Sequence, residues 1–533
     1  MSRLIQDPDV AHRRRWLTLL VLCISLIVIV LDNTILNVAI PTLAHPSAQG
    51  GLGASGSQLQ WIVDAYTLVF AGLLLTAGSL GDRFGRYRFL AVGLSIFGIG
   101  SLLSAFATSA TVLIATRALM GIGGAFIMPS TLSIITNVFT DPRERGKAIG
   151  IWAGVSALGL GVGPISGGAL LEHFWWGSIF IVNVPIVIAG LVLGYFLIPE
   201  SSDPSQARFD PVGAVLSVLA LGVLLRSVIE APSTGWGAPE IVVGFVGGGL
   251  LLAAFLLWEL RSSHPMLDLH FFEDPRFSAA SGAITLVFLA LYGTLFVITQ
   301  YLQSVLGYST VMAGAVVMPS AFVIMIFAPL SNTWVQKVGN KVVVTAGLGI
   351  VSASLILFTT LGVSSPALQV MAILALMGLG MANVMAPCTD SIMGSLPRAK
   401  AGVGSAVNDT TRQMGGAVGV AVFGSLMASH FSSSIVSRLG STVPAQVVQS
   451  VRDNVGKAIA VAHEPGLAPD IGGRVASAAK ASFVGGFHLI GLAGAGLTLV
   501  AAVGVALFLP ARPRAEEPPE IPANEPVGAG APR

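Results

Sequence analysis

Hydrophobic and polar residues alternate along this chain in blocks: apolar runs of about 20 residues are separated by short polar segments. A helix of about 20 apolar residues spans the hydrocarbon core of a bilayer. The pattern therefore predicts an all-α membrane protein with fourteen transmembrane helices. Their expected ranges are 16–38, 59–80, 89–108, 111–136, 148–170, 178–198, 211–229, 241–258, 278–299, 310–330, 342–361, 367–388, 402–427 and 483–509.

Lysine and arginine fall in alternate connections between these runs. Basic residues precede the first run at Arg13 to Arg15, and they recur within 83–88, 143–147, 337–341 and 398–400. The short connections between them, such as 44–58 and 300–309, contain no lysine or arginine. Because basic loops stay in the cytoplasm, we expect a multi-pass protein of the cell (plasma or inner) membrane with both termini cytoplasmic. The connection 428–482 is then a long external loop.

Composition supports this class. Of 533 residues, 54% are hydrophobic and 10% are charged, whereas soluble proteins are about 25% charged. A net charge of +2 gives no support for nucleic-acid binding. We see no His/Cys cluster with metal-ligand spacing, so no metal and no cofactor are expected. Residues 1–15 form a cytoplasmic segment, and the Pro- and Glu-rich tail 511–533 is expected to be disordered.

Three charged residues interrupt the first, second and fourth apolar runs: Asp32, Asp64 and Arg117. A charge at the centre of a bilayer costs at least ~2.5–3.5 kcal/mol, so such residues are candidates for function. Counting from the helix ends at 1.5 Å per residue places all three at a similar depth in the outer half. They are our candidates for proton coupling. The alternatives are a static hydrogen bond for Asp32, capping or snorkelling for Asp64, and a structural ion pair for Arg117.

An internal repeat links the fourth run to the twelfth. Residues 118–129 (ALMGIGGAFIMP) match 375–387 (ALMGLGMANVMAP) with one insertion, and polar residues that follow also match. An offset of eight fits a six-helix bundle at 16–198, two inserted helices at 211–258 and a second six-helix bundle at 278–509. Transporters are often built from such repeats. We expect the inserted helices to be peripheral.

Residues 78–88 (GSLGDRFGRYR) form a charged turn after the second run. Its glycines permit close approach of two helix ends, and its charges can form a clasp that breaks and reforms. The residues concerned are Gly78, Gly81, Asp82, Arg83, Gly85 and Arg86.

This turn resembles the loop motif of the major facilitator superfamily. Further motifs, at 31–41, 154–168, 180–185 and 404–416, resemble its fourteen-helix drug:proton antiporter family over about residues 15–510. The resemblance implies the major facilitator fold, two six-helix bundles plus two extra central helices. It implies proton coupling by Asp32 and Arg117, and an antiporter helix marked by Gly159, Gly163, Pro164 and Gly167.

A substrate cavity is expected between the bundles. Trp61, Trp152 and Tyr292 could contact flat cations through their rings, although aromatic residues at the membrane interface explain them equally well. Asp409 and Arg412 share a helix face, and mutual neutralisation is the simpler reading of that pair. The residues proposed for the cavity are Asn33, Asn37, Trp61, Trp152, Tyr292, Asp409 and Arg412. His488 is better explained as a packed hydrogen-bonding residue, and Asp390 as a residue at the water interface.

These observations predict a secondary transporter, not an enzyme, that exports amphiphilic or cationic compounds in exchange for protons by alternating access. The chain has no Gly-x-x-x-x-Gly-Lys phosphate loop, which argues against ATP as the fuel. An exporter of an endogenous metabolite or lipid would use the same mechanism and stays open. An intramembrane enzyme is less compatible with the sequence, because no nucleophile and base are paired.

Overall fold

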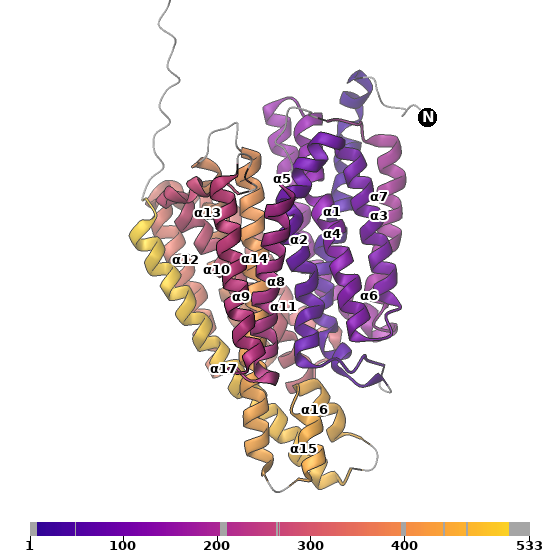
Figure 1. Cartoon of the computed structure of the whole chain (residues 1–533), viewed down its shortest axis with the longest axis vertical. Coiled ribbons are helices and arrows are strands. Elements are labelled where there is room, and N and C mark those ends of the chain that lie inside the picture. Colours follow the sequence, from indigo (N-terminus) through magenta and orange to yellow (C-terminus); the bar gives the residue numbers. More distant parts are fainter. Residues whose placement is uncertain are drawn as a thin grey trace, which may run out of the picture.

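The computed structural model describes residues 8–47, 50–202, 210–262, 265, 267–395, 401–440, 443–464 and 467–510. The tail 511–533, Arg398 and Lys400, and the side chain of Asp82 lie outside this description. The described part folds into long helices that run side by side (Figure 1). The first half comprises α1 (Pro8–Ala44), α2 (Gly56–Phe84), α3 (Arg86–Ala105), α4 (Ala110–Val138), α5 (Pro142–His173), α6 (Ser178–Ile181) and α7 (Asn183–Leu197).

Two helices follow, and a second half repeats the first. The inserted pair is α8 (Pro211–Thr234) and α9 (Pro239–Arg261). The second half comprises η2 (Leu269–Glu273), α10 (Pro275–Gln300), η3 (Tyr301–Val305), α11 (Thr310–Val338), α12 (Asn340–Leu357), η4 (Phe358–Thr360), α13 (Ala367–Gly394), α14 (Ala401–Leu439), α15 (Ala445–Val451), α16 (Val455–Ala462) and α17 (Pro469–Phe508).

Twelve helices in the described part are long and apolar enough to cross a membrane by length and composition. They coincide with twelve of the fourteen expected spans. The other two expected spans, 59–80 and 148–170, fall in α2 and α5, which have 29 and 32 residues but are not among the twelve. The count of fourteen therefore stays a prediction.

The two halves pack in the same way. Helix α4 packs against α2 and α3, and α13 packs against α11 and α12; α1 pairs with α5 as α10 pairs with α14. Single glycines join α2 to α3 and α11 to α12. Gly85 and Gly339 have φ values of 116° and 87°, a conformation that residues with a Cβ rarely adopt. The repeat read from the sequence thus corresponds to two bundles of like topology.

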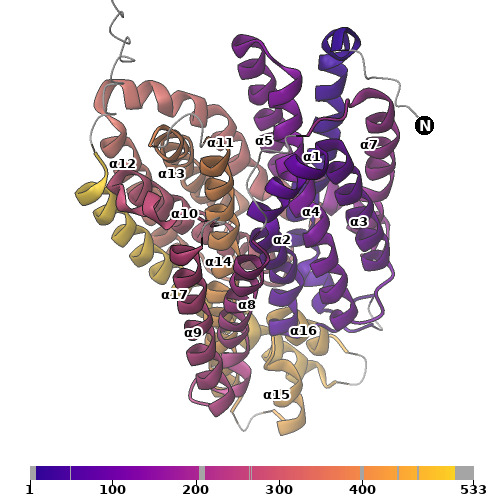
Figure 2. The same ribbon diagram turned by 45° about the horizontal axis from the view of Figure 1, so that its top comes forward.

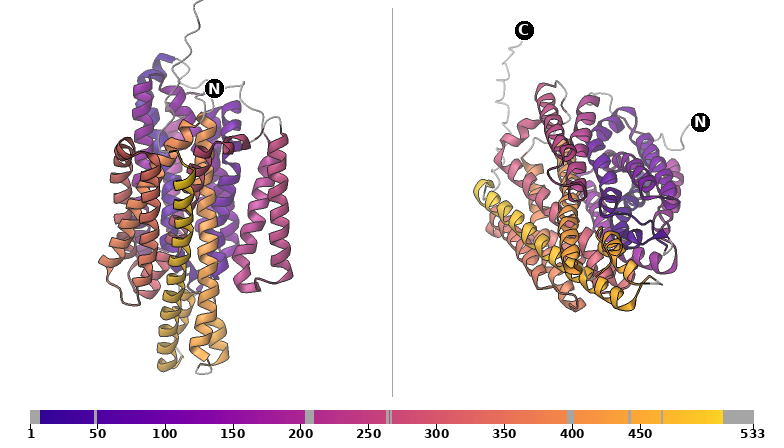
Figure 3. Two further views of the ribbon diagram at one scale, coloured as in Figure 1. Left: turned by 90° about the vertical axis from the view of Figure 1, so that its left-hand side faces the viewer. Right: turned by 60° about the horizontal axis from the view of Figure 1, so that its bottom comes forward.

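The halves meet along two seams. Helix α5 packs on α11, and α2 packs on α14. Helix α8 also touches α2 and α14, while α9 packs mainly on α8 and faces outward (Figures 2 and 3). The inserted pair therefore covers the α2–α14 seam from the outside.

The segment expected as a loop at 428–482 is largely helical. Helix α14 continues to Leu439, α15 and α16 follow, and α17 begins at Pro469. This extension projects beyond the bundle at the face opposite the N-terminus, which we call the far face (Figure 3). Helix α1 begins and α17 ends at the other face, the N-terminal face (Figure 1). The helices of this segment continue beyond the apolar runs into more polar sequence, so the hydrophobic pattern alone suggested a loop.

Candidate functional site

A buried ion pair joins α1 to α4. Nη1 of Arg117 lies 2.5 Å from Oδ2 of Asp32, and the two side chains are 1% and 2% exposed. The Asn183 side-chain amide, on α7, donates to the other carboxylate oxygen at 3.3 Å. Charges this deep in a bundle need partners. The structure thus brings together two of the three charges singled out in the sequence.

The Arg117 guanidinium is also fixed from α2. Its Nε donates to the Ile62 carbonyl at 3.0 Å, and its central carbon lies 4.4 Å from the centre of the Tyr66 ring. Four helices, α1, α2, α4 and α7, therefore meet at the ion pair. A proton added to Asp32 would remove the negative partner, so the packing of all four helices is sensitive to the charge of this carboxyl group.

Asp64 is not part of this cluster. It lies two residues from both Ile62 and Tyr66, which is about 200° around α2 and away from α4. Its side chain is 0% exposed. In the described part of the chain neither carboxylate oxygen has a hydrogen-bond partner. The sequence indicated a similar depth for the three charges but not the direction in which each side chain points.

Helices α1 and α5 cross at a point where only glycine fits. A Cβ on Gly163 would lie 1.8 Å from Oγ1 of Thr34, and a Cβ on Gly159 would lie 2.5 Å from the Val30 side chain. Thr34 also donates to the Gly159 carbonyl at 3.3 Å. Gly167 likewise lies against Ile35. The glycines of the expected antiporter helix therefore place α5 against the turn that follows Asp32.

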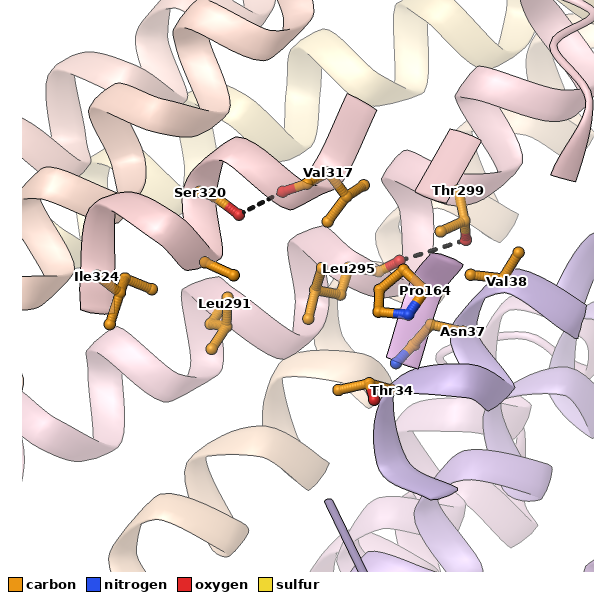
Figure 4. Close-up of a pocket in the computed structure, with 11 residues that line it drawn as sticks. Thr34, Asn37, Val38, Pro164, Leu291, Leu295, Thr299, Val317, Ser320 and Ile324 are labelled. Carbon is orange, nitrogen blue, oxygen red and sulfur yellow. Dashed lines mark hydrogen bonds between the residues drawn. The ribbon is translucent and has the colours of Figure 1, made fainter. Parts of the chain in front are cut away.

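A pocket lies between the halves next to this crossing. Figure 4 shows Pro164 of α5 beside Asn37 of α1 and Leu295 of α10. The lining is mainly apolar, with a few hydroxyl and amide groups. The lining residues are Thr34, Asn37, Val38, Pro164, Leu291, Leu295, Thr299, Val317, Ser320, Ala321 and Ile324. Asn37 is the one residue of the expected cavity set in this lining.

The second half has a different polar cluster. Nη1 of Arg412 lies 3.9 Å from Oδ1 of Asp409, and its Nη2 donates to Oγ1 of Thr389 at 2.9 Å. The guanidinium also lies 5.4 Å from the centre of the Phe288 ring. In the aligned repeat Leu374 precedes Ala375 as Arg117 precedes Ala118. The second half therefore lacks a counterpart of the buried arginine.

Other expected cavity residues lie at helix contacts. The Trp152 indole donates to Oγ1 of Thr131 at 3.2 Å, and Thr131 is the repeat partner of Thr389. The Tyr292 ring packs against Gly416. Trp61 packs against a small apolar cluster between α2, α8 and α14. His488 contacts the Leu361 carbonyl at 2.7 Å, as expected of a packed histidine.

The charged turn between α2 and α3 has a partner that the sequence did not reveal. The Glu200 carboxylate accepts from the Tyr87 amide at 3.0 Å and lies 3.5 Å from Nε of Arg88. A Cβ on Gly85 would lie 2.9 Å from Glu200, so the glycine is required for space as well as for its φ. Glu200 lies just after α7. In the sequence, its position at the end of an apolar run is the only signal that could have identified it as a partner of this turn.

At the far face, hydrogen bonds between described residues join the first half to the second. The Val38 carbonyl accepts from the Gln303 amide at 2.9 Å, and the Gly168 carbonyl accepts from the Thr310 hydroxyl at 2.9 Å. Two more run from the Val311 amide to Glu172 and from Asn454 to the Ala54 carbonyl.

Glu172 caps the start of α11 from the other half. Hydrogen bonds from the Ser309 hydroxyl and the Val311 amide hold the pKa of Glu172 below its usual range. Its carboxylate form therefore stabilises the contact between α5 and α11 at the far face.

Comparison with known proteins decides the family. The sequence profile of the Major Facilitator Superfamily matches residues 22–420. The chain belongs to this superfamily. It is accordingly a transporter and not an enzyme, and the expected all-α membrane fold is confirmed.

Relatives match almost the whole chain. The multidrug efflux pump LfrA of Mycolicibacterium smegmatis is 38% identical over 92% of this chain and 96% of its own length. The methyl viologen resistance protein SmvA of Salmonella typhimurium is 34% identical over 92% and 98%. The tetracenomycin C resistance and export protein of Streptomyces glaucescens is 34% identical over 96% and 94%.

Solved structures share the fold. A bacterial homologue of the human lysosomal transporter Spinster, in an inward-facing and unoccupied conformation, matches with a TM-score of 0.63 and 17% identity over 94% of this chain and 98% of its own. A peptide transporter (POT) matches with a TM-score of 0.60 and 16% identity over 92% and 93%. At these identities the likeness concerns the fold alone.

Proposed function

We propose that this superfamily member is a fourteen-helix drug:proton antiporter that exports amphiphilic or cationic compounds from the cell. The observation that carries the proposal is the buried pair of Asp32 and Arg117, which ties four helices of one half together. The relatives described above are named for efflux or resistance, which supports this class of substrate.

The basic connections support a cytoplasmic location for the N-terminal face, by the positive-inside rule. The far face is then external, and its hydrogen bonds between the halves close the outer side. We infer an inward-facing state. The pocket beside Pro164 would hold part of the substrate, and its apolar lining suits a flat, poorly hydrated molecule.

In this mechanism the charge of Asp32 controls the packing around Arg117. A proton on Asp32 leaves the arginine with neutral partners, among them the Ile62 carbonyl and the Tyr66 ring. Loss of the proton restores the ion pair. Binding and loss of a proton on opposite sides of the membrane would bias the tilt of α1 and α4 relative to the second half, which couples proton entry to export.

Efflux of ethidium, a fluorescent lipophilic cation, from cells tests the proposal. Wild-type protein should lower the steady-state dye level, and Asp32→Asn should abolish this effect at equal expression. Glu230→Gln is the matched control, because it neutralises a partly exposed acid on α8, which is not one of the four helices that meet at the ion pair. Undiminished efflux by Asp32→Asn would refute the role of Asp32. Loss of efflux in both variants would show that the effect is not specific to the ion pair.

A further inference from the structure

Asp64 lies at the seam between the halves. On the same face of α2, Leu68 packs with Leu225 and Ile229 of α8 and with Ala417 and Ala421 of α14. One turn from Asp64 toward the far face, the Gln60 side chain approaches Gly424 of α14 so closely that a Cβ there would lie 2.2 Å from its Nε2. Asp64 stands between these contacts, so it faces α14 and α8.

Helix α8 closes this seam from the side. The Ser425 hydroxyl on α14 donates to the Val228 carbonyl of α8, and a Cβ on Gly72 of α2 would lie 2.3 Å from the Val218 side chain of α8. The inserted helix is therefore in van der Waals contact with both halves. Its apolar face separates Asp64 from the surrounding lipid.

The seam contains polar groups whose hydrogen bonds are not made. Both carboxylate oxygens of Asp64 and Oε1 of Gln60 are buried without a hydrogen-bond partner in the described part of the chain. An ionised carboxylate in such surroundings costs several kcal/mol, and a neutral acid costs far less. The closed seam is therefore compatible with a protonated Asp64 and strongly disfavours an ionised one.

A pocket near the far face ends one helical turn from Asp64. It lies on the side of α16 that faces the bundle, between α2, α10, α14 and α17. Its polar lining comprises Gln60, Gln300, Asp453 and Asn454. Asp453 is 37% exposed and forms an ion pair with Lys457 at 3.0 Å. Gln60 forms the inner end of this polar lining, one helical turn, or about 6 Å, from Asp64. This polar lining leads from the far face to within one helical turn of Asp64.

The charged groups on the neighbouring helices face elsewhere. Arg412 on α14 lies nine residues from Ala421, about 14 Å along the helix, and pairs with Asp409. On α8, Arg226 is exposed and Glu230 is partly exposed, and both lie away from the face that carries Leu225 and Ile229.

The helices on the other side of α2 and in the second half bring no charge closer. Arg117 reaches α2 from the α4 side, at the Ile62 carbonyl. Tyr292 of α10 packs on Gly416, on the part of α14 nearer the N-terminal face. Among the described residues, no charged side chain on these helices therefore faces Asp64, and its charge depends only on whether its carboxyl group carries a proton.

We propose that Asp64 is a second proton-binding site, separate from the Asp32–Arg117 pair and reached from the far face through the pocket of Asp453 and Gln60, and that the α2–α14 seam closes only when Asp64 is protonated. The proposal rests on the proposed antiport function and deepens it. Loading of this site from outside permits the outer side to close after substrate release. Helix α8 has a defined task in this scheme: it keeps the site dry while the seam is closed.

The separation of α2 and α14 at the far face tests the proposal. Spin labels at Ser57→Cys and Ser433→Cys, with Cys23 and Cys388 replaced by alanine, report this distance in lipid nanodiscs without substrate or gradient. In the wild type, a longer distance should gain population as the pH rises from 5.5 to 9. Asp64→Asn should hold the short distance over the whole range.

Glu230→Gln is the control and should keep the pH response of the seam, because it neutralises a partly exposed acid on the side of α8 that points away from the seam. Asp64→Glu should fold and keep the response with a shifted midpoint, because a longer acid sits differently in the seam. A normal pH response in Asp64→Asn would overturn the proposal. If Asp64→Asn fails to fold, an unshifted midpoint in Asp64→Glu would overturn it instead. If wild-type efflux ignores the proton gradient while the seam still responds to pH, the antiport function fails and the Asp64 site stands.

Discussion

The ion pair of Asp32 and Arg117 can be tested by a double-mutant cycle on stability. Its two side chains are almost fully buried and its charged atoms lie 2.5 Å apart. At an effective dielectric constant of about 20, charges 4 Å apart attract by about 4 kcal/mol. Removal of one member leaves the other buried without a counter-charge, which costs about 3–5 kcal/mol in proteins.

We therefore expect Asp32→Asn and Arg117→Met each to lower the free energy of unfolding by about 3–5 kcal/mol. The double variant has no buried charge, so it should lose less stability than either single variant. All three should lose proton-driven efflux. The double variant should therefore regain stability relative to the single variants without regaining efflux. This difference separates the structural role of the pair from its role in coupling.

Unfolding of the purified protein by SDS titration in mixed micelles measures these stabilities. The cycle needs only the ranking of four proteins under one condition. If the loss of unfolding free energy in the double variant equalled the sum of the losses in the two single variants, the residues would act independently. The ion pair would then contribute nothing to stability. If it regained proton-driven efflux, the coupling role of both residues would be refuted.

Two further predictions concern the contacts of α5. Gly163→Ala would force a Cβ to 1.8 Å from the Thr34 hydroxyl, so we expect this variant to lose about 1–3 kcal/mol of stability and to lose efflux. The control is Gly349→Ala, whose Cβ would meet open space. Equal efflux by the two variants would contradict this prediction. The pKa of Glu172 is lowered by its contacts to Ser309 and Val311, so its carboxylate stabilises far-face closure above its usual pKa and the effect fades as pH falls through the lowered value. Glu172→Gln should therefore raise maleimide labelling of a far-face cysteine at pH 7, and labelling equal to wild type at pH 7 would refute the contact.

Much of the architecture could be predicted from the sequence, because the hydrocarbon thickness fixes the length of each apolar run. The repeat at 118–129 and 375–387 indicated two halves, and the structure gives α4 and α13 the same neighbours. The pairing of Asp32 with Arg117 agrees with their equal depth. Depth follows from counting residues along a helix, so it was accessible without tertiary structure.

The direction of each side chain was not accessible in this way. The rotation of α2 about its axis is set by packing on α4, α8 and α14, so the separation of Asp64 from Arg117 appears only in the fold. The helical extension over 428–482 was missed because its residues are too polar for a span yet still favour helix. Glu200 was missed because its partners, the Tyr87 amide and Arg88, are more than a hundred residues away.

Transport by the purified protein in liposomes tests the central claim most directly. Ethidium is supplied on one side, and a pH difference imposed by buffer exchange is the only source of energy. The account predicts that dye moves against its gradient while protons move the opposite way, that reversing the pH difference reverses dye movement, and that nigericin, which collapses that difference in K⁺ buffers, stops it. Concentrative dye transport that is unchanged by nigericin would contradict it.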